Sequence, residues 1–259
     1  INLGTLAVDG TVALTTNGNG AATVVNDAGL NFAASTVRGN LAATATTGNM
    51  TDSGALTVAG TTTLTTSANN ATIALDTTTN AFTGAVTITT NDDSGTDADV
   101  TIDNGTTALI LAASTIDGDL TLTSGHASGI TDSGTVTVGG NLAATTDDNN
   151  GVINLGTLAV DGTVALTTNG SGNATVVNDA GLNFAASTVR GNLAATATTG
   201  NMTDSGALTI SGTSSFTTSA NNATIALDTT TNAFTGAVTI TTNDDSGTDA
   251  DVTIDGGTT

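Results

Sequence analysis

A near-identical internal repeat constrains this chain more than any other feature of its sequence. Residues 1–107 realign on residues 153–259 without a gap and differ at eight positions, such as Asn104 against Gly256. The long period is therefore 152 residues, with a first long repeat at 1–152 followed by a second, truncated copy. Repeats of this kind stack, because one unit cannot bury its own apolar face. We expect one continuous solenoid that is a window on a longer array.

A shorter period lies inside the long one. Glycine-centred blocks such as VDGTVALTT, which starts at Val8 and again at Val160, place their glycines 29, 21, 24, 34, 22 and 22 residues apart. Most steps are close to 22 residues, which suits one coil of a solenoid. We expect three coils to a unit of 74 or 78 residues and two units to the long repeat. The extra residues of the 29- and 34-residue steps are expected to form loops or an added strand at one edge.

The blocks have the pattern of short strands. In the first block Val8, Val12 and Leu14 share one parity while the residues between them are polar or small, so one face of each strand is buried. The block glycine marks a corner. The chain contains no Glu, Gln or Lys and about a quarter of it is Thr, which disfavours helix and favours strand. We predict an all-β fold, a right-handed parallel β-helix (β-solenoid) with coils of about 22 residues.

Two other structures deserve comparison with this prediction. A sandwich of β-hairpins would show similar turn spacing, but near-identical units of coil length favour stacking in register. Disorder is suggested by the net charge of −21, whereas the regular apolar spacing favours a folded chain.

Charge excludes several classes of partner. Arg38 and Arg190 are the basic residues of the chain, so the positive surface that nucleic-acid binding requires is missing. Anionic membranes would repel the chain, and no apolar run predicts membrane insertion of this segment. The absence of Cys excludes disulfides and thiolate metal sites.

Strings such as NAFTGAVTITT (80–90) and GNMTDSGALTVAGTTTLTT (48–66) resemble the β-strand repeats of filamentous-haemagglutinin-like giant exoproteins of Gram-negative bacteria. The resemblance covers essentially the whole chain. It implies a parallel β-helix, an extracellular or cell-surface location, and a role in adhesion, biofilm or surface filaments. Partners implied in this way are further repeats or other copies of the chain, host or neighbouring-cell surfaces, and glycans.

One acidic segment occurs in both copies and holds the candidate metal ligands of the chain. Several carboxylates on one loop could supply the oxygen ligands that Ca²⁺ prefers, although the segment matches neither an EF-hand nor a calcium-binding nonapeptide repeat. A solvated acidic loop is the simpler interpretation. The candidate ligands are Asp92, Asp93, Asp97, Asp99 and Asp103, and in the second copy Asp244, Asp245, Asp249, Asp251 and Asp255.

A threonine follows each block glycine at the fifth position, as at Thr15, Thr44 and Thr65. Its parity faces outward, which predicts a straight threonine ladder along the rod. Such a ladder packs well on itself, and as an alternative function it could bind ice. Arg38 is expected to pair with Asp9 of the preceding coil.

No catalytic or cofactor-binding residues are predicted. His126, the one histidine, lies in a turn with no recognisable nucleophile and acid beside it. Polysaccharide lyases with a parallel β-helix depend on Arg, Lys and aromatic residues that this chain nearly lacks. We therefore expect a structural rod or fibre segment of an exported adhesin or filament, and, as the alternative, an acidic solenoid that Ca²⁺ stiffens or bridges.

Overall fold

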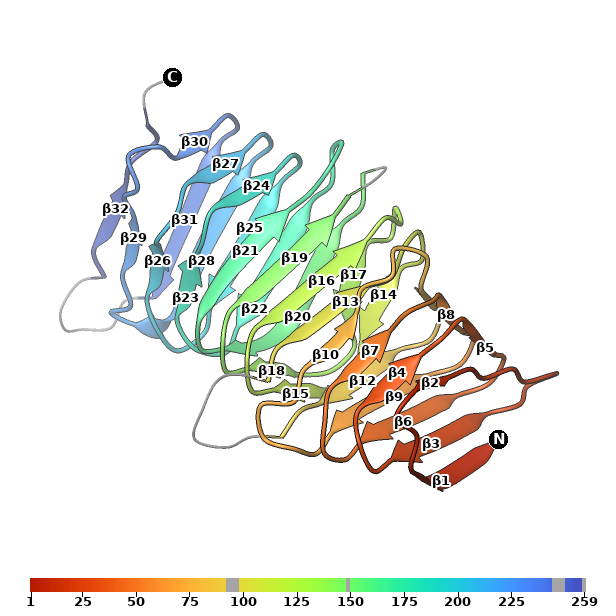
Figure 1. The fold of residues 1–259 in the computed structure, drawn as a ribbon. Coiled ribbons are helices and arrows are strands. Elements are labelled where there is room, and N and C mark those ends of the chain that lie inside the picture. Colours follow the sequence, from red (N-terminus) through yellow and green to blue (C-terminus); the bar gives the residue numbers. More distant parts are fainter. Residues whose placement is uncertain (92–97, 148–149, 244–249, 258–259) are drawn as a thin grey trace.

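The chain folds into one stack of parallel β-strands. A computed structural model describes residues 1–91, 98–147, 150–243 and 250–257, in which all the regular elements are strands and all the strand pairs are parallel. About 11 turns stack at intervals of about 21 residues (Figure 1). At about 4.8 Å per turn, the rod is roughly 50 Å long. The predicted parallel β-solenoid is confirmed.

Three sheets carry the strands. Sheet A consists of β1 (Asn2–Leu6), β3 (Ala22–Asn26), β6 (Leu41–Ala45), β9 (Thr62–Thr66), β12 (Val86–Thr89), β14 (Leu109–Leu111), β15 (Ser114–Ile116), β17 (Ile130–Asp132), β18 (Val136–Val138), β20 (Ile153–Val160), β22 (Ala174–Asn178), β25 (Leu193–Ala197), β28 (Ser214–Asn221) and β31 (Val238–Asn243). Sheet B consists of β2 (Thr11–Val12), β4 (Leu30–Phe32), β7 (Met50–Asp52), β10 (Ile73–Leu75), β13 (Val100–Asp103), β16 (Leu120–Ser124), β19 (Leu142–Thr146), β21 (Thr163–Thr167), β23 (Leu182–Phe184), β24 (Ser187–Val189), β26 (Met202–Asp204), β27 (Leu208–Ile210), β29 (Ile225–Leu227), β30 (Ala233–Phe234) and β32 (Val252–Ile254). Sheet C consists of β5 (Ser35–Val37), β8 (Leu56–Val58) and β11 (Ala81–Phe82).

Columns of aliphatic side chains form the core. In sheet A, Val24 lies over Ala43, Ala43 over Leu64, and Leu64 over Ile88, and each is at most 1% exposed. The period-two pattern of the sequence produces these columns, since alternate side chains of each strand point inward. Burying a row of such side chains along the rod supplies the main stabilising free energy.

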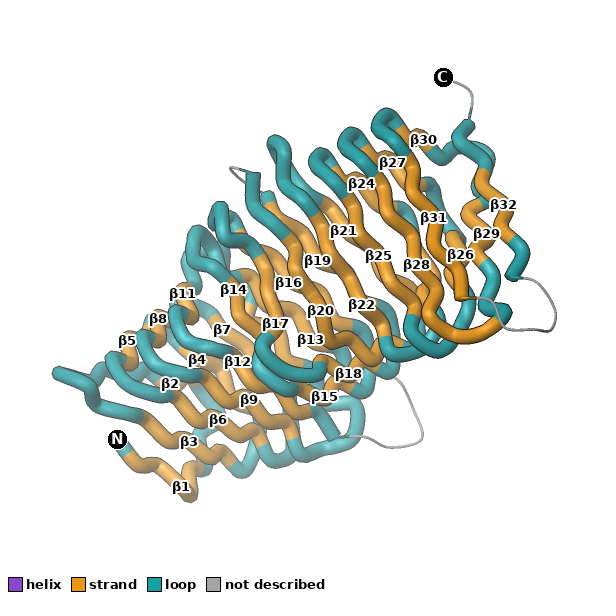
Figure 2. The backbone as a smooth tube through the Cα atoms, turned by 180° about the vertical axis from the view of Figure 1, so that it is seen from behind, coloured by secondary structure: helices purple, strands orange, loops and turns teal. Residues whose placement is uncertain are grey.

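Sheets A and B form the two broad faces of the rod, and the long block strands move from one of these sheets to the other along its length (Figure 2). Between residues 41 and 89 the long block strands β6, β9 and β12 lie in sheet A, and the short strands lie in sheets B and C. Between residues 109 and 146 the long strands β16 and β19 lie in sheet B, and short pairs such as β14 and β15 lie in sheet A. The same sequence pattern therefore occupies opposite faces in the two halves of a repeat.

The long glycine steps cause this exchange. The 29-residue step leads from β2 in sheet B to β6 in sheet A, and the 34-residue step leads from β12 in sheet A to β16 in sheet B. Each long step thus spans one and a half turns instead of one turn with an added loop or edge strand. The prediction of three turns to a unit was wrong, because each unit contains three and a half turns. Seven whole turns make up the 152-residue period, so β1 and its equivalent in β20 lie in the same sheet.

The solenoid continues through the junction between the copies. Strand β20 pairs with β17 and β18 of the first copy on one side and with β22 of the second copy on the other. Sheets A and B therefore cross residues 152 and 153 without interruption.

Candidate functional site

The predicted calcium ligands are only partly within the described residues. Asp92, Asp93, Asp97, Asp244, Asp245 and Asp249 lie outside them. Asp99 and Asp103 lie just before and at the end of β13, which separates them by about 13 Å at the rise of a β-strand. Because this distance is several times a Ca–O bond, the two carboxylates do not meet at one ion.

These aspartates contact backbone groups. Asp99 Oδ1 accepts a hydrogen bond from Asp119 N at 2.8 Å, and Asp103 Oδ1 accepts one from Gly105 N at 2.8 Å. In the second copy Asp255 Oδ1 accepts from Gly257 N at 2.8 Å, while Asp251 is exposed. Within the residues that the structure describes, no three His, Cys, Asp or Glu side chains are grouped to hold a metal ion. Calcium binding stays a prediction that depends on the segments around residues 92–97 and 244–249.

Asp103 has an unusual electrostatic environment. Burial raises the pKa of its carboxyl above the ordinary value of 3.8, and Asp147, Asp76 and Asp52 raise it further, while the hydrogen bond from Gly105 opposes the shift. Like charges and desolvation both disfavour the ionised form. Asp103 also lines a shallow groove with Asp147, so this corner of the rod concentrates negative charge.

The predicted single threonine ladder is absent. The block threonines lie in four separate rows instead, because the block strands change sheets at each long step. The first row is Thr15, Thr36 and Thr57. The second, in sheet A, is Thr44, Thr65, Thr89, Thr115 and Thr137. The third, in sheet B, is Thr123, Thr145, Thr167, Thr188 and Thr209. The fourth, again in sheet A, is Thr196, Thr217 and Thr241. An extended flat ice-binding plane therefore loses its structural basis.

The predicted stacking of Arg38 on Asp9 is also wrong. The backbone N of Arg38 donates to Thr16 Oγ1 at 2.8 Å and that of Gly39 donates to Gly20 O at 2.9 Å, so the coil below Arg38 presents residues 16–20 there and not Asp9. The backbone N of the equivalent Arg190 donates to Thr168 Oγ1 at 2.9 Å. The reason is again the long step, which places Asp9 at the corner between sheets A and B and Arg38 at the corner that leads into sheet A.

Two of the buried asparagines, Asn26 and Asn178, lie where the block strands move from sheet B to sheet A. Asn178 Oδ1 accepts from Val160 N at 2.8 Å, and its Nδ2 donates to Val160 O at 3.0 Å and to Gly181 O at 2.6 Å. Asn26 makes the same three bonds to Val8 and Gly29. The amide side chain thus supplies the hydrogen bonds to the N–H and C=O of Val160 or Val8 that the backbone of a neighbouring strand would otherwise make. Buried polar groups need such partners.

A third asparagine closes sheet C. Asn104 Oδ1 accepts from Phe82 N at 2.7 Å, and its Nδ2 donates to Phe82 O at 3.1 Å and to Ala108 O at 2.9 Å. Phe82 is the last residue of β11, beyond which sheet C has no further strand. In the second copy the equivalent position is Gly256, which has no side chain to contact Phe234. Sequence reasoning missed these asparagine caps, although Asn26, Asn104 and Asn178 all share the parity of buried aliphatic residues.

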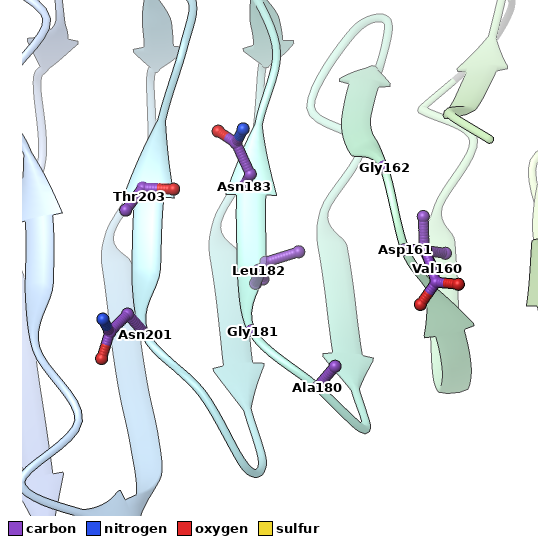
Figure 3. Close-up of a pocket in the computed structure, with 9 residues that line it drawn as sticks. All are labelled: Val160, Asp161, Gly162, Ala180, Gly181, Leu182, Asn183, Asn201 and Thr203. Carbon is purple, nitrogen blue, oxygen red and sulfur yellow. The ribbon is translucent and has the colours of Figure 1, made fainter. Parts of the chain in front are cut away.

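Shallow grooves accompany these caps. Figure 3 shows one groove, about 300 Å³ in volume, where three successive coils contribute Asp161, Asn183 and Thr203. Its lining includes Val160 and Gly181, to which Asn178 is hydrogen-bonded. An equivalent groove in the first copy includes Asp9, Asn31 and Thr51. The side chains of Asp161 and Asn183 point in opposite directions in Figure 3. In this groove the two polar side chains therefore do not converge on one point.

The single histidine takes part in turn structure. His126 Nδ1 accepts a hydrogen bond from Ser128 N at 3.0 Å, and His126 O accepts one from Gly129 N at 2.8 Å. Nδ1 and the backbone carbonyl of His126 therefore both serve to hold the turn at 126–129.

The capped turns and exchanging faces define a tandem-repeat β-solenoid. The chain belongs to the family described as repeats of unknown function (DUF5649), whose model matches residues 19–89, 97–147 and 171–241. The first and last of these segments are the same part of the two copies. No curated protein and no solved structure matches the chain. Within the described residues, no helix has the length and apolar character needed to cross a bilayer.

Proposed function

We propose that this solenoid is a structural rod segment of a cell-surface or secreted filament, in the manner of filamentous-haemagglutinin-like adhesins. The observation that carries the proposal is the continuity of sheets A and B, which run through both copies of the repeat and across their junction. A rod of this kind lengthens by one turn for each added coil and needs no new type of interface.

The surface also suits a spacer. Of the large hydrophobic side chains among the described residues, Ile1, Val238 and Val252 are exposed, and all three lie at the ends of the rod. The sides of the rod carry threonine rows and aspartates, and the net charge of −21 keeps rods apart laterally. Adhesion and export rest on the resemblance of the repeats, as does location on the outer surface of a Gram-negative-type bacterium.

We further propose that the rod has no enzymatic activity. The lone histidine serves a turn, and the grooves gather no nucleophile, base and oxyanion donors in one place. The rod then acts as a spacer that holds other parts of the filament away from the cell surface.

The test is to locate the protein in the organism that produces it. Antibodies against residues 1–259 are expected to label intact cells or shed filaments, and protease treatment of intact cells should remove this label. Electron microscopy of the labelled material should show thin rods. A protein found in the cytoplasm of intact cells would refute the proposal.

A further inference from the structure

Several asparagines of the chain are followed directly by glycine, and asparagine is one of the chemically labile residues of proteins. In an Asn-Gly pair the backbone nitrogen of the glycine can attack the side-chain amide carbon, because glycine has no side chain to hinder the approach and its backbone adapts readily. The pairs share this chemistry, so their surroundings in the fold decide which of them reacts. The asparagines concerned are Asn17, Asn19, Asn104, Asn150 and Asn169.

The pair Asn169–Gly170 lies in an exposed turn between β21 and β22. Gly170 N donates to Asn169 Oδ1 at 2.7 Å, so the glycine nitrogen lies against the side-chain amide that it would attack. The amide carbon is bonded to this oxygen, and the contact therefore keeps it near the separation of about 3–3.5 Å that defines a near-attack arrangement. Water reaches the pair, since both residues are exposed.

The preceding coil holds the amide of Asn169 in this position. Asn169 Nδ2 donates to Asp147 O at 2.9 Å, which restrains rotation of the side chain. A restrained amide has less conformational freedom to lose when a ring closes. The turn also requires its glycine, because Gly170 has a φ of +61° and a Cβ atom there would lie 2.2 Å from Asn150 Oδ1. The fold thus keeps the glycine and aligns its nitrogen with the amide.

Asn104 belongs to the same kind of pair but lies in a protected setting. Its Oδ1 accepts from Phe82 N at 2.7 Å, and its Nδ2 donates to Phe82 O at 3.1 Å. Gly105 N donates to Asp103 Oδ1 at 2.8 Å, so its N–H is directed to that carboxylate and not to the amide of Asn104. Asn104 is also fully buried, which keeps water away. The folded chain should therefore preserve this asparagine.

Asn150 gives a second comparison, in an exposed position. Its Oδ1 accepts from Ser171 N at 2.7 Å and from Ser171 Oγ at 3.1 Å, so the amide is directed to the next coil. The glycine that follows, Gly151, is buried. Exposure of the asparagine alone therefore does not bring the two reacting groups of a pair together.

We propose that Asn169 is a site of spontaneous deamidation in the folded rod. Gly170 N forms a bond to Asn169 Cγ, the bond from Cγ to Nδ2 breaks, and Nδ2 leaves as ammonia with the proton that Gly170 N loses. The product is a cyclic imide, which water then opens. Cleavage between Gly170 N and Cγ gives aspartate, whereas cleavage between Gly170 N and the backbone carbonyl carbon of Asn169 gives isoaspartate. Water is the co-reactant, and no oxidation or reduction takes place.

The modification changes one contact between coils and goes beyond the structural role proposed above. Either product replaces the Nδ2 donor to Asp147 O with a carboxylate oxygen, which can only accept, so two acceptors then face each other. The new carboxylate also adds a negative charge to a chain whose net charge is −21. Isoaspartate in addition lengthens the main chain within the turn. We expect the turn at 169–172 to loosen while the aliphatic columns beside it stay packed.

Mass spectrometry of peptides from the aged full chain tests the proposal, with water labelled with oxygen-18 to mark carboxyl groups formed during the incubation. In the folded chain Asn169 is expected to convert about tenfold faster, or more, than Asn104 and Asn150, because only the first pair has its reacting groups aligned. The rate at Asn169 should rise with pH, since hydroxide removes the proton of Gly170 N. In the chain unfolded by urea the three rates should become similar.

Two variants serve as controls. Asn169→Gln keeps an amide at this position but needs a larger ring for the attack, so it should show no conversion there. Asn169→Asp carries one of the products from the start and should show faster hydrogen exchange at 169–172, with exchange in β22 unchanged. An Asn169 that stays intact in the folded chain, or that converts no faster than Asn104, would overturn the proposal. Either result would leave the rod function untouched, since that function does not depend on this turn.

Discussion

The side chain of Asn104 brackets the backbone of Phe82, with Oδ1 accepting from Phe82 N at 2.7 Å and Nδ2 donating to Phe82 O at 3.1 Å. Sheet C ends at Phe82, and the amide supplies one donor and one acceptor in place of the missing strand. Asn104 is fully buried, so both groups are shielded from water. The exchange of faces is therefore possible because one polar side chain satisfies the backbone that the departing chain leaves behind.

Removing this cap should destabilise the rod. In Asn104→Gly the backbone N–H and C=O of Phe82 lose their partners inside the core, which costs about 1–3 kcal/mol for each unsatisfied group. We expect a loss of roughly 2 kcal/mol or more in the free energy of unfolding, measured by urea titration. An exposed asparagine provides the control, and Asn17→Gly should change the stability little.

The second copy allows the reverse experiment. Gly256 stands where the first copy has Asn104, and a Cβ atom added there would meet nothing within 4 Å. Gly256→Asn is therefore expected to restore the cap over Phe234 and to stabilise the last coils by about 1 kcal/mol. Hydrogen exchange at the Phe234 amide measures the effect, and unchanged protection there would show that the glycine is not a missing cap.

Asp103 should make stability depend on pH. Its pKa in the folded chain is above the ordinary 3.8, so the folded state binds more protons than the unfolded state in the window above that value. Stability contributed by this group is thus lost as the pH rises through the window. The free energy of unfolding of Asp103→Asn minus that of the unmodified chain should increase as the pH rises from 3 to 7. Urea unfolding of both proteins at each pH measures this difference.

A variant at Asp147 tests how much this neighbouring carboxylate contributes to the raised pKa of Asp103. Asp147 adds to the shift less than burial does. Asp147→Asn should therefore reproduce only part of the pH dependence seen with Asp103→Asn. A stability difference between Asp103→Asn and the unmodified chain that stays constant with pH would contradict the assignment to Asp103.

Alanine in place of a block glycine should leave stability unchanged only where an added Cβ atom would not contact the backbone of the preceding coil. A Cβ atom at Gly84 would lie 2.4 Å from Gly60 O and 2.6 Å from Gly60 C, which are backbone atoms of the previous coil. Gly84→Ala must separate two coils and is expected to cost about 3 kcal/mol, the upper end of the usual cost of overpacking. At Gly10 the same atom meets nothing within 4 Å, so Gly10→Ala should be close to neutral in thermal unfolding.

Removal of whole turns should be tolerated, and removal of half a turn should not. Deleting residues 119–140 takes out one 22-residue step and would place Leu142 where Leu120 now lies over Val100. We expect cooperative unfolding with a urea m-value lower by roughly a tenth, since m follows the surface exposed on unfolding. Deleting residues 119–129 instead puts the aliphatic positions of all later coils on the wrong face. That variant should aggregate or lose its β-sheet circular dichroism.

The fold could be predicted from the sequence because its signal is repeated in every coil. Val12, Leu14 and their equivalents mark buried positions, and the near-constant glycine spacing fixes the length of a turn. Half-turn steps were the point of failure. A step of 29 residues fits one turn with a loop as well as one and a half turns, and only strand pairing, such as β6 with β3, distinguishes the two.

The polar contacts were harder to predict for a different reason. Asn26 has the parity of a core residue, but parity does not show which backbone groups lack a partner, and this depends on the path of the neighbouring coil. The threonine ladder and the pairing of Arg38 with Asp9 failed because both assumed that equal block positions stack in one column. Calcium binding by the acidic segments stays a prediction, because six of the ten candidate aspartates lie outside the described residues.

Because the block strands move between sheets A and B, both broad sides of the rod carry the same type of strand pattern at different heights. The pattern of block strands that one broad side carries at a given height recurs on the opposite side three and a half turns further along, about 17 Å at the spacing of stacked strands. The outward side chains of the block strands therefore form rows on each broad side, and the rows of the two sides are staggered along the rod by half a repeat.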